Sequence, residues 1–423
     1  MLQIAEIREN KNVFAKALQK RNIDALPLLE SAIAADENRR SLQGQLDEIL
    51  AKSNKLSREI GELFKSGKAS EANILKAQTT ELKESSKQLG DQLNTAVEEL
   101  QQILYTIPNI PQDSVPAGNS DEDNEVISQH GELPVLYDAA KPHWELVKDY
   151  DIIDFELGNK ITGAGFPVYK NKGARIQRAL INYFLDKNTA AGYVEMQVPH
   201  LVNEASGYGT GQLPDKEGQM YHVGVDDLYL IPTGEVPITN MHRGSLLEMK
   251  DFPIVMTGYT PCFRREAGSY GSDVRGLNRL HQFDKVEILR IEHPDKSDAA
   301  LDAMVVHVQG ILEELELPYR ILRLCGGDLG FTSTLTYDFE VYSAAQKKWL
   351  EVSSVSNFKT FQANRLKLRY RNGEKGTELA HTLNGSSLAL PRVLASILEN
   401  FQVAGGIKIP KVLIPYCGFD VID

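Results

Sequence analysis

Hydrophobic side chains recur every seven residues through the first quarter of the chain. The first register holds Leu42, Leu46, Ile49, Ser53, Leu56, Ile60 and Leu63. The second register follows the sequence SGKAS at 66–70 and holds Leu75, Leu82, Leu89, Leu93, Ala96, Leu100, Ile103 and Ile107. Alternating positions of this kind predict two helices that share a seam. Because the turn between them is short, we expect an antiparallel hairpin arm, ~50 Å long at ~1.5 Å per residue.

Prolines and acidic residues separate this arm from the rest of the chain. Three prolines between 108 and 116 and the run SDEDNE at 120–125 mark a linker. Residues 1–25, ahead of the arm, have the pattern of a short helical cap. We therefore predict two domains, a helical one at 1–112 and a larger one at 113–423.

The larger domain mixes helical and strand patterns. Residues 174–187 have helical spacing and are followed by alternation at 193–199, which predicts a strand. Residues 208–214 are expected to form a loop, 228–237 a strand and then a loop, and 337–357 a β-hairpin that turns at AAQKK. The fold class expected from this mixture is α+β.

A second hairpin, at 257–291, carries charge on both of its expected strands. With side chains alternating between faces, Arg264 and Glu266 share one face of the first strand, and Phe283 and Glu287 share one face of the second. Arginine grips phosphate or carboxylate with two hydrogen bonds, an aromatic ring stacks on a nucleobase, and a carboxylate binds an ammonium or hydroxyl. The ring and the second carboxylate are expected ~13 Å apart at ~3.3 Å per residue.

The connection at 267–280 is rich in glycine and arginine. It holds Arg275, Arg279, Gly268, Gly271 and Gly276. This composition predicts cationic side chains on a backbone free to adopt unusual conformations. From spacing alone, the alternative is a β-hairpin with a solvated loop.

Near the C-terminus, Thr382, Asn384 and Ser386 alternate on one expected strand face. Ser386 or Ser387 is expected to cap the helix that follows, with Pro391 in its first turn. Arg392 would then lie near a helix N-terminus, where free N–H groups favour a phosphate.

Composition is ordinary and charge is unevenly distributed. Hydrophobic residues make up 42% of the chain and charged residues 25%, as in soluble globular proteins. The net charge of −12 argues against a nucleic-acid-binding protein whose whole surface is basic. Between 39 and 88, however, ten Lys or Arg face seven Asp or Glu, a net charge of +3. Contact with RNA is therefore expected at the arm alone.

Cysteine usage points to a reducing compartment. Cys262, Cys325 and Cys417 lie far apart without CxxC spacing, so neither a disulfide framework nor a zinc site is supported. The N-terminus shows no apolar segment of a secretion signal, and no run approaches ~18 apolar residues. We expect a cytoplasmic protein with no membrane contact.

The hairpin sequences FRREAG and RGLNRLHQFDKVE resemble motif 2 of the class II aminoacyl-tRNA synthetases, in the form found in bacterial seryl-tRNA synthetases. The helix and strand at 174–199 resemble motif 1. The segment that ends in Arg392 resembles motif 3, although Leu390 and Pro391 stand where many relatives have a small residue before the arginine. The resemblance runs essentially end to end. It implies a coiled-coil arm, a mostly antiparallel sheet flanked by helices, and a homodimer.

The family resemblance also implies a reaction. L-Serine and ATP would form seryl-adenylate, and the seryl group would pass to the 3′ end of tRNA(Ser), with Mg²⁺ as cofactor and charging of tRNA(Sec) left open. The serine carboxylate is already ionised at pH 7, so the first step needs no general base. Catalysis is expected to consist of positioning and charge neutralisation.

Individual roles follow from the same resemblance. The catalytic residues are Arg264 on the serine carboxylate and α-phosphate, Arg392 on the γ-phosphate and Glu351. The serine contacts are Thr233, Glu235, Arg264, Glu287, Asn384 and Ser386, with Thr382 beside them. The ATP contacts are Arg264, Arg265, Glu266, Arg279, Phe283, Glu351, Val352, Ser353, Ser354 and Arg392. Glu351 and Ser354 are the metal ligands, and since alternation would put them on opposite faces, a bulge or strand end is expected there.

In this family the arm reaches the long variable arm of the tRNA. The candidates for RNA contact, chosen by charge and position, are Lys52, Lys55, Arg58, Lys65, Lys68 and Lys76. From the heptads alone, a coiled coil that only dimerises or scaffolds is the alternative.

Two other functions compete with the ligase. One is a synthetase-like paralogue that binds RNA or a partner without catalysis, and it would be marked by loss of Arg264, Glu351 or Arg392, which are all present. The other is a ligase that loads an amino acid onto a carrier protein. Such a protein would have little use for a long arm.

Overall fold

The computed structural model describes residues 1–215, 218–266, 275–373 and 376–423. These residues form two compact units, one made of Met1–Gln19 and Ile23–Pro108, the other of Lys20–Asn22 and Asn109–Asp423. Gly268 and Gly271 of the expected glycine-rich connection lie outside the described residues.

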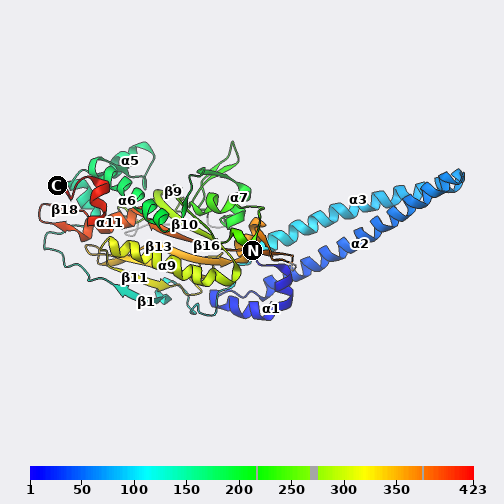
Figure 1. Ribbon diagram of the computed structural model, residues 1–423, viewed down its shortest axis with the longest axis horizontal. Helices are drawn as coiled ribbons and strands as arrows, with labels where there is room; N and C mark the ends of the chain where they lie inside the picture. The colour runs from blue at the N-terminus through cyan, green and yellow to red at the C-terminus, as the bar shows by residue number, and fades with distance from the viewer. Residues whose placement is uncertain (216–217, 267–274, 374–375) are drawn as a thin grey trace. The chain divides into compact units, whose positions relative to one another are not determined.

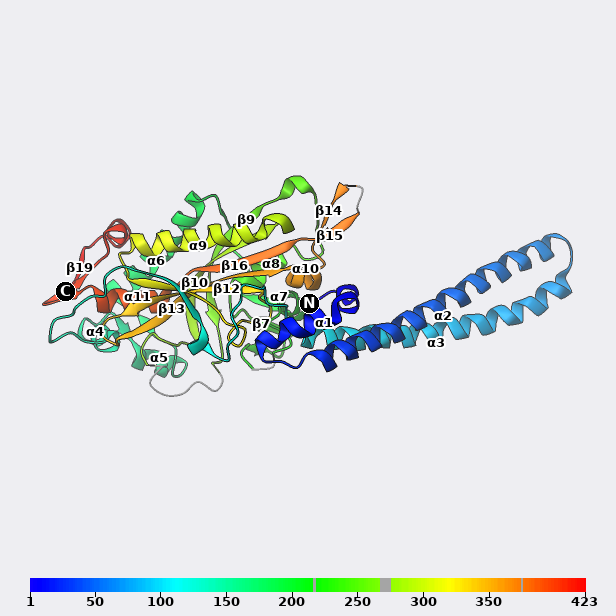
Figure 2. The same ribbon diagram turned by 90° about the horizontal axis from the view of Figure 1, so that it is seen from below.

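The first unit is a helical hairpin. α1 (Ile4–Leu18) precedes α2 (Leu26–Lys65) and α3 (Ala69–Thr106), which run side by side in Figures 1 and 2 and are joined by a turn at 66–68. The heptad positions from Leu42 to Leu63 are half-buried, while most of the positions between them are exposed. The predicted antiparallel arm and its seam are therefore confirmed.

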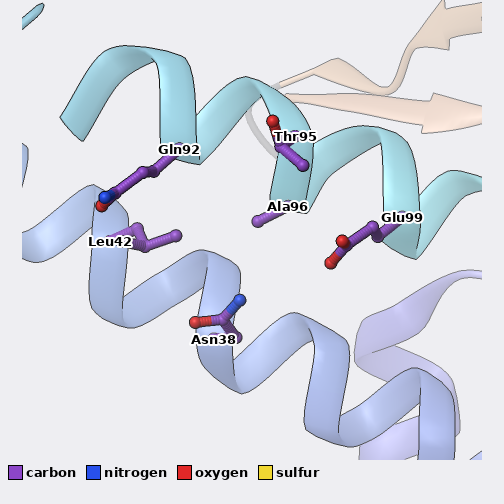
Figure 3. A pocket seen from close by; sticks show the side chains of 6 residues that line it. All are labelled: Asn38, Leu42, Gln92, Thr95, Ala96 and Glu99. Carbon is purple, nitrogen blue, oxygen red and sulfur yellow. The ribbon is translucent and has the colours of Figure 1, made fainter. Parts of the chain in front are cut away.

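The seam is not evenly filled. Figure 3 shows a hollow between the two helices, lined by Asn38, Leu42, Gln92, Thr95, Ala96 and Glu99. Ala96 is 3% exposed and occupies a heptad position where a methyl group leaves space opposite Leu42. Four of the six side chains are polar, so the hollow is a packing gap in the coiled coil and lacks the apolar lining of a typical small-molecule pocket.

The second unit is built on a sheet that has eight strands among the described residues. Its order is β1 (Glu125–His130), β11 (Tyr319–Arg323), β12 (Leu335–Ser343), β13 (Lys348–Lys359), β16 (His381–Ala389), β10 (Gln282–Glu292), β9 (Ile254–Phe263) and β4 (Val194–Glu195). Every pair is antiparallel except β4 and β9. The mostly antiparallel α+β architecture is confirmed.

Smaller sheets and helices complete this unit. The short strands are β2 (Ile153–Asp154) with β3 (Val168–Tyr169), β5 (Leu201–Asn203) with β7 (Leu228–Leu230) and β6 (His222–Val223), β8 (Leu246–Leu247) with β14 (Arg369–Arg371) and β15 (Thr377–Leu379), and β17 (Gln402–Val403) with β18 (Gly406–Lys408) and β19 (Val421–Ile422). The helices are α4 (His143–Asp149), α5 (Phe155–Ile161), α6 (Asn171–Ala190), α7 (Glu204–Thr210), α8 (Glu235–Asn240), α9 (Ser297–Glu314), α10 (Thr360–Leu366), α11 (Leu390–Asn400) and α12 (Ile414–Cys417).

The two faces of the large sheet have different surroundings. α6, α9 and α11 pack on one face, where Ile288 of β10, Val355 of β13 and Leu383 of β16 join a single apolar core (Figure 1). Because successive side chains alternate, the opposite face of the same strands receives Glu287, Asn384 and their polar neighbours. Burial of the first face thus fixes which side chains the second face presents.

The expected bulge is present in the predicted hairpin of β12 and β13. Phe339 pairs with Ser353, whereas Glu340 pairs with Glu351, so Val352 is the extra residue. The bulge interrupts strict alternation between Glu351 and Ser354. The side chains of both residues can therefore face the same metal ion, as their predicted role demands.

The first strand of the charged hairpin is shorter than expected. β9 ends at Phe263, so Arg264 and Glu266 do not share a strand face. The Arg264 N–H still donates to the His281 carbonyl at 2.9 Å, but Glu266 adopts a positive φ of 48° and leaves the strand. The assignment of both residues to one strand was therefore wrong, because the strand pairing stops where the connection begins to turn.

Four further expectations need correction. Part of the expected loop at 208–214 belongs to α7, and Glu235 begins α8, where a loop was expected. The strand expected at 193–199 is reduced to Val194–Glu195. Ala389 is the N-cap of α11 and no side chain caps that helix, so Ser386 and Ser387 do not have the expected capping role; they remain within β16. Pro391 lies in the first turn as predicted.

Within the described part of the chain, none of the helices combines the length and the apolar character that crossing a lipid bilayer requires.

Candidate active site

A buried carboxylate lies at the centre of the polar sheet face. Glu287 of β10 is 1% exposed and pairs with Ser386 of β16 on one side and Gly258 of β9 on the other. Its carboxylate accepts hydrogen bonds from Thr233 at 3.1 Å and from the Asn384 amide at 2.8 Å. Of the expected serine contacts, the structure therefore brings Thr233, Glu287, Asn384 and Ser386 together.

A lysine that the sequence analysis did not select neutralises this carboxylate. Lys285 is 6% exposed, and its ammonium lies 2.5 Å from a carboxylate oxygen of Glu287. It also donates a hydrogen bond of 2.7 Å to the Thr233 hydroxyl. The alternation that puts Phe283 and Glu287 on one face puts Lys285 there too, so the signal was present in the sequence.

Glu235 provides a second buried carboxylate beside the first. It is 7% exposed and accepts a hydrogen bond of 2.6 Å from the Gln362 amide, whose oxygen accepts one of 2.7 Å from Thr382. Burial, and then the negative charge of Glu287, raise the pKa of Glu235 to about 7. The ammonium of Lys285 forms its ion pair with Glu287, while Lys285 and Arg264 act on the Glu235 carboxyl only through their charge, so this second carboxylate favours a further cation.

Arg264 and Phe283 lie against each other at the junction of β9 and β10. The guanidinium carbon is 5.2 Å from the centre of the ring, and the Nε–H of Arg264 donates to the Pro232 carbonyl at 3.2 Å. Both side chains are half-buried. A cation and an aromatic face are therefore held together, as the pattern of the hairpin predicted.

The remaining motif 2 candidates lie around this junction. Glu266 forms an ion pair with Arg279, which joins the two sides of the hairpin. Arg265 is exposed and its N–H donates to the Gln219 carbonyl at 2.8 Å. Glu266 is thus partly engaged by Arg279 in this structure.

The expected motif 3 arginine meets the expected metal carboxylate. Arg392 is the third residue of α11, and one of its terminal N–H groups donates to the backbone carbonyl of Glu351 at 2.8 Å. The same nitrogen lies 3.6 Å from the Glu351 carboxylate, and the Arg392 Nε–H donates to the Asn278 carbonyl at 2.8 Å. One cation therefore bridges β13 and the end of the motif 2 connection.

The other candidates on β13 face in different directions. Val352 is buried in the apolar core, and the Ser353 hydroxyl donates to the Ser386 carbonyl at 2.6 Å. Because the Val352 side chain packs in the core and the Ser353 hydroxyl is hydrogen-bonded within the protein, a nucleotide can contact these two residues only through their backbone atoms. Ser354 is half-buried and pairs with Asp338 of β12.

Beside Glu351, this region has a second acidic residue, Asp338, which was not predicted from the sequence. It is 9% exposed, and its Oδ1 has no hydrogen-bond partner among the described residues. Burial, and then the charge of Glu351, raise the pKa of Asp338 well above its usual range. With Ser354, these oxygen atoms form a set that suits a hard cation such as Mg²⁺. The described residues contain no cluster of three or more His, Cys, Asp or Glu for a metal, so phosphate and water would complete the shell.

The six arm candidates, Lys52, Lys55, Arg58, Lys65, Lys68 and Lys76, belong to the first unit, and all are exposed on α2, α3 or the turn between them. Lys68 pairs loosely with Glu71 at 3.6 Å, and the Lys76 ammonium lies 5.8 Å from the centre of the Phe64 ring. These positions are open to a partner.

Comparison with known proteins decides the family. Residues 1–111 match the seryl-tRNA synthetase N-terminal domain, and 221–401 match the class II tRNA synthetase core domain for G, H, P, S and T. A serine–tRNA ligase of Salinibacter ruber is 48% identical over 99% of this chain and 98% of its own length. The chain belongs to the seryl-tRNA synthetases. A relative from Chlorobaculum parvum, also a serine–tRNA ligase, is 44% identical over 100% of both chains.

A solved structure agrees with this family assignment. The seryl-tRNA synthetase of Pyrococcus horikoshii, crystallised with ATP, has a TM-score of 0.91 and 32% identity over 100% of this chain and 99% of its own. The protein is thus an ATP-dependent serine–tRNA ligase that activates L-serine to seryl-adenylate and transfers the seryl group to tRNA. The comparisons give no support to the inactive or carrier-loading alternatives.

Because the pKa of Glu235 is raised in the folded protein, we expect the stability of the protein to depend on pH. Its carboxyl ionises near pH 4.5 when unfolded and near pH 7 when folded, so the folded form loses stability as pH rises through this window, by on the order of 3 kcal/mol. Glu235→Gln keeps an oxygen for Gln362 and removes this loss. We expect the difference in thermal midpoint, variant minus wild type, to be more positive at pH 8 than at pH 5. A difference that does not grow with pH contradicts the assignment.

Proposed function

We propose that Glu235, Glu287, Thr233, Asn384 and Ser386 bind the serine substrate. The observation that carries this proposal is the pair of buried carboxylates, of which, among the described residues, only Glu287 has a cation in direct contact. The ammonium group of serine supplies the missing positive charge, and hydroxyl and amide groups on β16 and in the Thr233 turn can pair with its polar atoms. A serine side chain that pairs with these groups favours serine over alanine, which would leave them unpaired.

The nucleotide lies along the same face toward α11 in this proposal. Arg264 holds the serine carboxylate and the α-phosphate, with Phe283 under the adenine and Glu266 at the adenine edge. Arg392 binds the γ-phosphate, supported by its contacts with Asn278 and Glu351. Arg265 and Arg279 add charge at the rim, and the backbone of Val352 and Ser353 lines the phosphates.

These residues catalyse the reaction by positioning serine and ATP and by stabilising charge. The serine carboxylate attacks the α-phosphorus and pyrophosphate leaves, so no proton moves in this step. The guanidinium groups of Arg264 and Arg392 hold the attacking and leaving groups in line and stabilise the charge that spreads over the phosphate oxygens. Glu351 and Ser354, with Asp338 behind them, would hold Mg²⁺, which neutralises phosphate charge when bound.

RNA binding is assigned to the first domain. We place its boundary at 1–112 and the catalytic domain at 113–423, close to the two compact units. Exposed cations on α2 and α3 contact the long variable arm of tRNA(Ser), and charging of tRNA(Sec) would depend on the same contacts. A homodimer formed through the motif 1 region around α6 and a cytoplasmic location complete the proposal.

Serine binding is expected to depend on pH through Glu235. The substrate ammonium favours the ionised carboxylate, whereas the free site holds a proton below about pH 7. The KM for serine in pyrophosphate exchange should therefore fall, up to tenfold per unit, as pH rises from about 5.5 to 7. In Glu235→Gln the serine KM should be higher and independent of pH in this window. A wild-type KM that stays flat or rises over the window argues against this role.

Removal of Arg392 tests the nucleotide end of the site. Loss of a cation aimed at charge that develops on the phosphates typically costs about 10²–10³ in rate, so Arg392→Ala should reduce kcat/KM for ATP by that factor in serine-dependent exchange. Arg371→Ala, an exposed arginine of β14 paired with Glu248, is the matched control and should stay within twofold. Equal activity of the two variants would remove Arg392 from the mechanism.

Neutralising the arm separates its function from catalysis. A full-length variant with Gln at all six arm cations should keep serine-dependent exchange near wild type, since exchange needs no tRNA. Its kcat/KM for charging tRNA(Ser) should fall at least about tenfold, because each exposed pair contributes up to ~1 kcal/mol. The dependence of charging on salt should also weaken. Unchanged charging at physiological salt would show that the arm is not the RNA contact.

A further inference from the structure

A buried histidine and glutamate pair lies behind the candidate nucleotide site and has no part in the roles proposed above. His143 begins α4 and Glu399 lies near the end of α11, and both side chains are fully buried. The imidazole Nδ1 and a Glu399 oxygen are 2.7 Å apart, and the same oxygen accepts the His143 backbone N–H at 2.9 Å. Burial alone would raise the pKa of Glu399, but the hydrogen bonds from His143 and Ser343 outweigh it and the pKa is lowered.

The other nitrogen of the imidazole holds the motif 2 connection. The backbone N–H of Leu277 donates to His143 Nε2 at 2.8 Å. Because Nε2 accepts this bond, the ring proton is on Nδ1 and is donated to Glu399. The imidazole thus joins the backbone of the connection to α11, and it does so as the neutral tautomer.

The connection is shaped to meet this ring. Gly276 has a positive φ of 68°, and a Cβ there would lie 2.2 Å from His143 Nε2, so a side chain is excluded. Next to it, the Arg275 guanidinium lies 4.7 Å from the centre of the Trp144 ring, which packs edge-on against His143. Three consecutive residues, 275–277, are therefore docked on the start of α4.

The contacts return to the arginine proposed to bind ATP. Asn278, the next residue, accepts the Arg392 Nε–H on its carbonyl at 2.8 Å. Its side chain donates to Gln346 at 2.8 Å, and Gln346 donates to Glu399 at 3.0 Å. Arg392 and Glu399 are seven residues apart on α11, which is two turns. One face of this helix therefore carries both residues at which the hydrogen-bonded network through His143 and Asn278 ends.

We propose that His143 is a positioning residue for ATP: by fixing Leu277 it places the Asn278 carbonyl, and through it the guanidinium of Arg392, for contact with the phosphates. This inference rests on the proposed role of Arg392. The serine pocket lies on β10, β16 and α8, and among the residues that the structure describes it shares no hydrogen bond with this network, so the effect of losing His143 falls on ATP alone.

Two variants separate the two nitrogens of the ring. His143→Asn keeps an amide N–H near the Nδ1 position for Glu399 but offers no acceptor to Leu277. His143→Gln extends far enough to place an amide oxygen near the Nε2 position and keeps that acceptor. In serine-dependent pyrophosphate exchange, His143→Asn should raise the KM for ATP at least about tenfold, the effect of leaving one buried N–H unpaired, with the serine KM within threefold. His143→Gln should keep both KM values within threefold.

A spectroscopic readout checks the docking itself. The chain has two tryptophans, Trp144 and Trp349, so Trp349→Phe leaves Trp144 as the sole reporter of segment 275–277. On this background His143→Asn should increase quenching of Trp144 by acrylamide, and His143→Gln should not. His307→Asn, at a partly buried histidine of α9 that contacts Asn188 at 2.7 Å, is the control and should leave both KM values within threefold.

Several results would overturn the proposal. Equal ATP KM values for His143→Asn and His143→Gln, a parallel rise in the serine KM, or the same ATP effect in His307→Asn would each make His143 merely structural. If the His143 variants do not fold, Gly276→Ala serves instead, because its methyl group displaces the segment while His143 and Glu399 remain; an unchanged ATP KM there overturns the proposal. An Arg392→Ala variant with normal ATP kinetics would instead reject the proposed function, so the two failures are distinguishable.

Discussion

The pairing register of β10 between β9 and β16 is the constraint on which the site depends. It places Glu287 opposite Ser386 and Gly258, with Asn384 two residues further along β16. A shift by one residue would turn Glu287 into the apolar core and Ile288 into the site. The core formed with α6, α9 and α11 prevents that shift, because charge is costly to bury without partners. Packing on one face thus specifies chemistry on the other.

Electrostatics then decides what the site prefers to bind. Lys285 pairs with Glu287, and burial together with the charge of Glu287 raises the pKa of the neighbouring Glu235 to about 7. At the other end Arg392 lies beside Glu351, with Asp338 buried behind. The face therefore has an end deficient in positive charge, suited to an ammonium group, and an end where cations and oxygen ligands gather, suited to phosphates. An aminoacyl-adenylate has its charges in that order.

Patterns of short period were predictable from the sequence, and contacts between distant segments were not. The heptads predicted the seam of the arm residue by residue, and alternation predicted which side chains share a face within β10 and within β16 and the need for a bulge or strand end between Glu351 and Ser354. The end of β9 before Arg264 and the cap of α11 depend on local geometry that no pattern encodes. The hydrogen bond from Gln362 to Glu235 joins two helices that are far apart along the chain, so no pattern of short period could predict it.

His143 illustrates that limit most clearly. Leu277, which it binds, is 134 residues away, and a single histidine after a proline carries no signal of its own. Lys285 is a different case, since its position between Phe283 and Glu287 on one strand face was visible in the alternation. The roles taken from the family resemblance concerned residues that would touch substrate, whereas the contacts of His143 emerged only from packing.

In the proposed function, one continuous sheet face holds the serine and the adenosine together. A crystal structure of the protein with a non-hydrolysable seryl-adenylate analogue, such as the sulfamoyl adenosine of serine, tests this most directly. We expect the ammonium between Glu235 and Glu287, the sulfamoyl group at Arg264 and the adenine on Phe283. An analogue whose ammonium lies away from both carboxylates, or whose base stacks elsewhere, would contradict it.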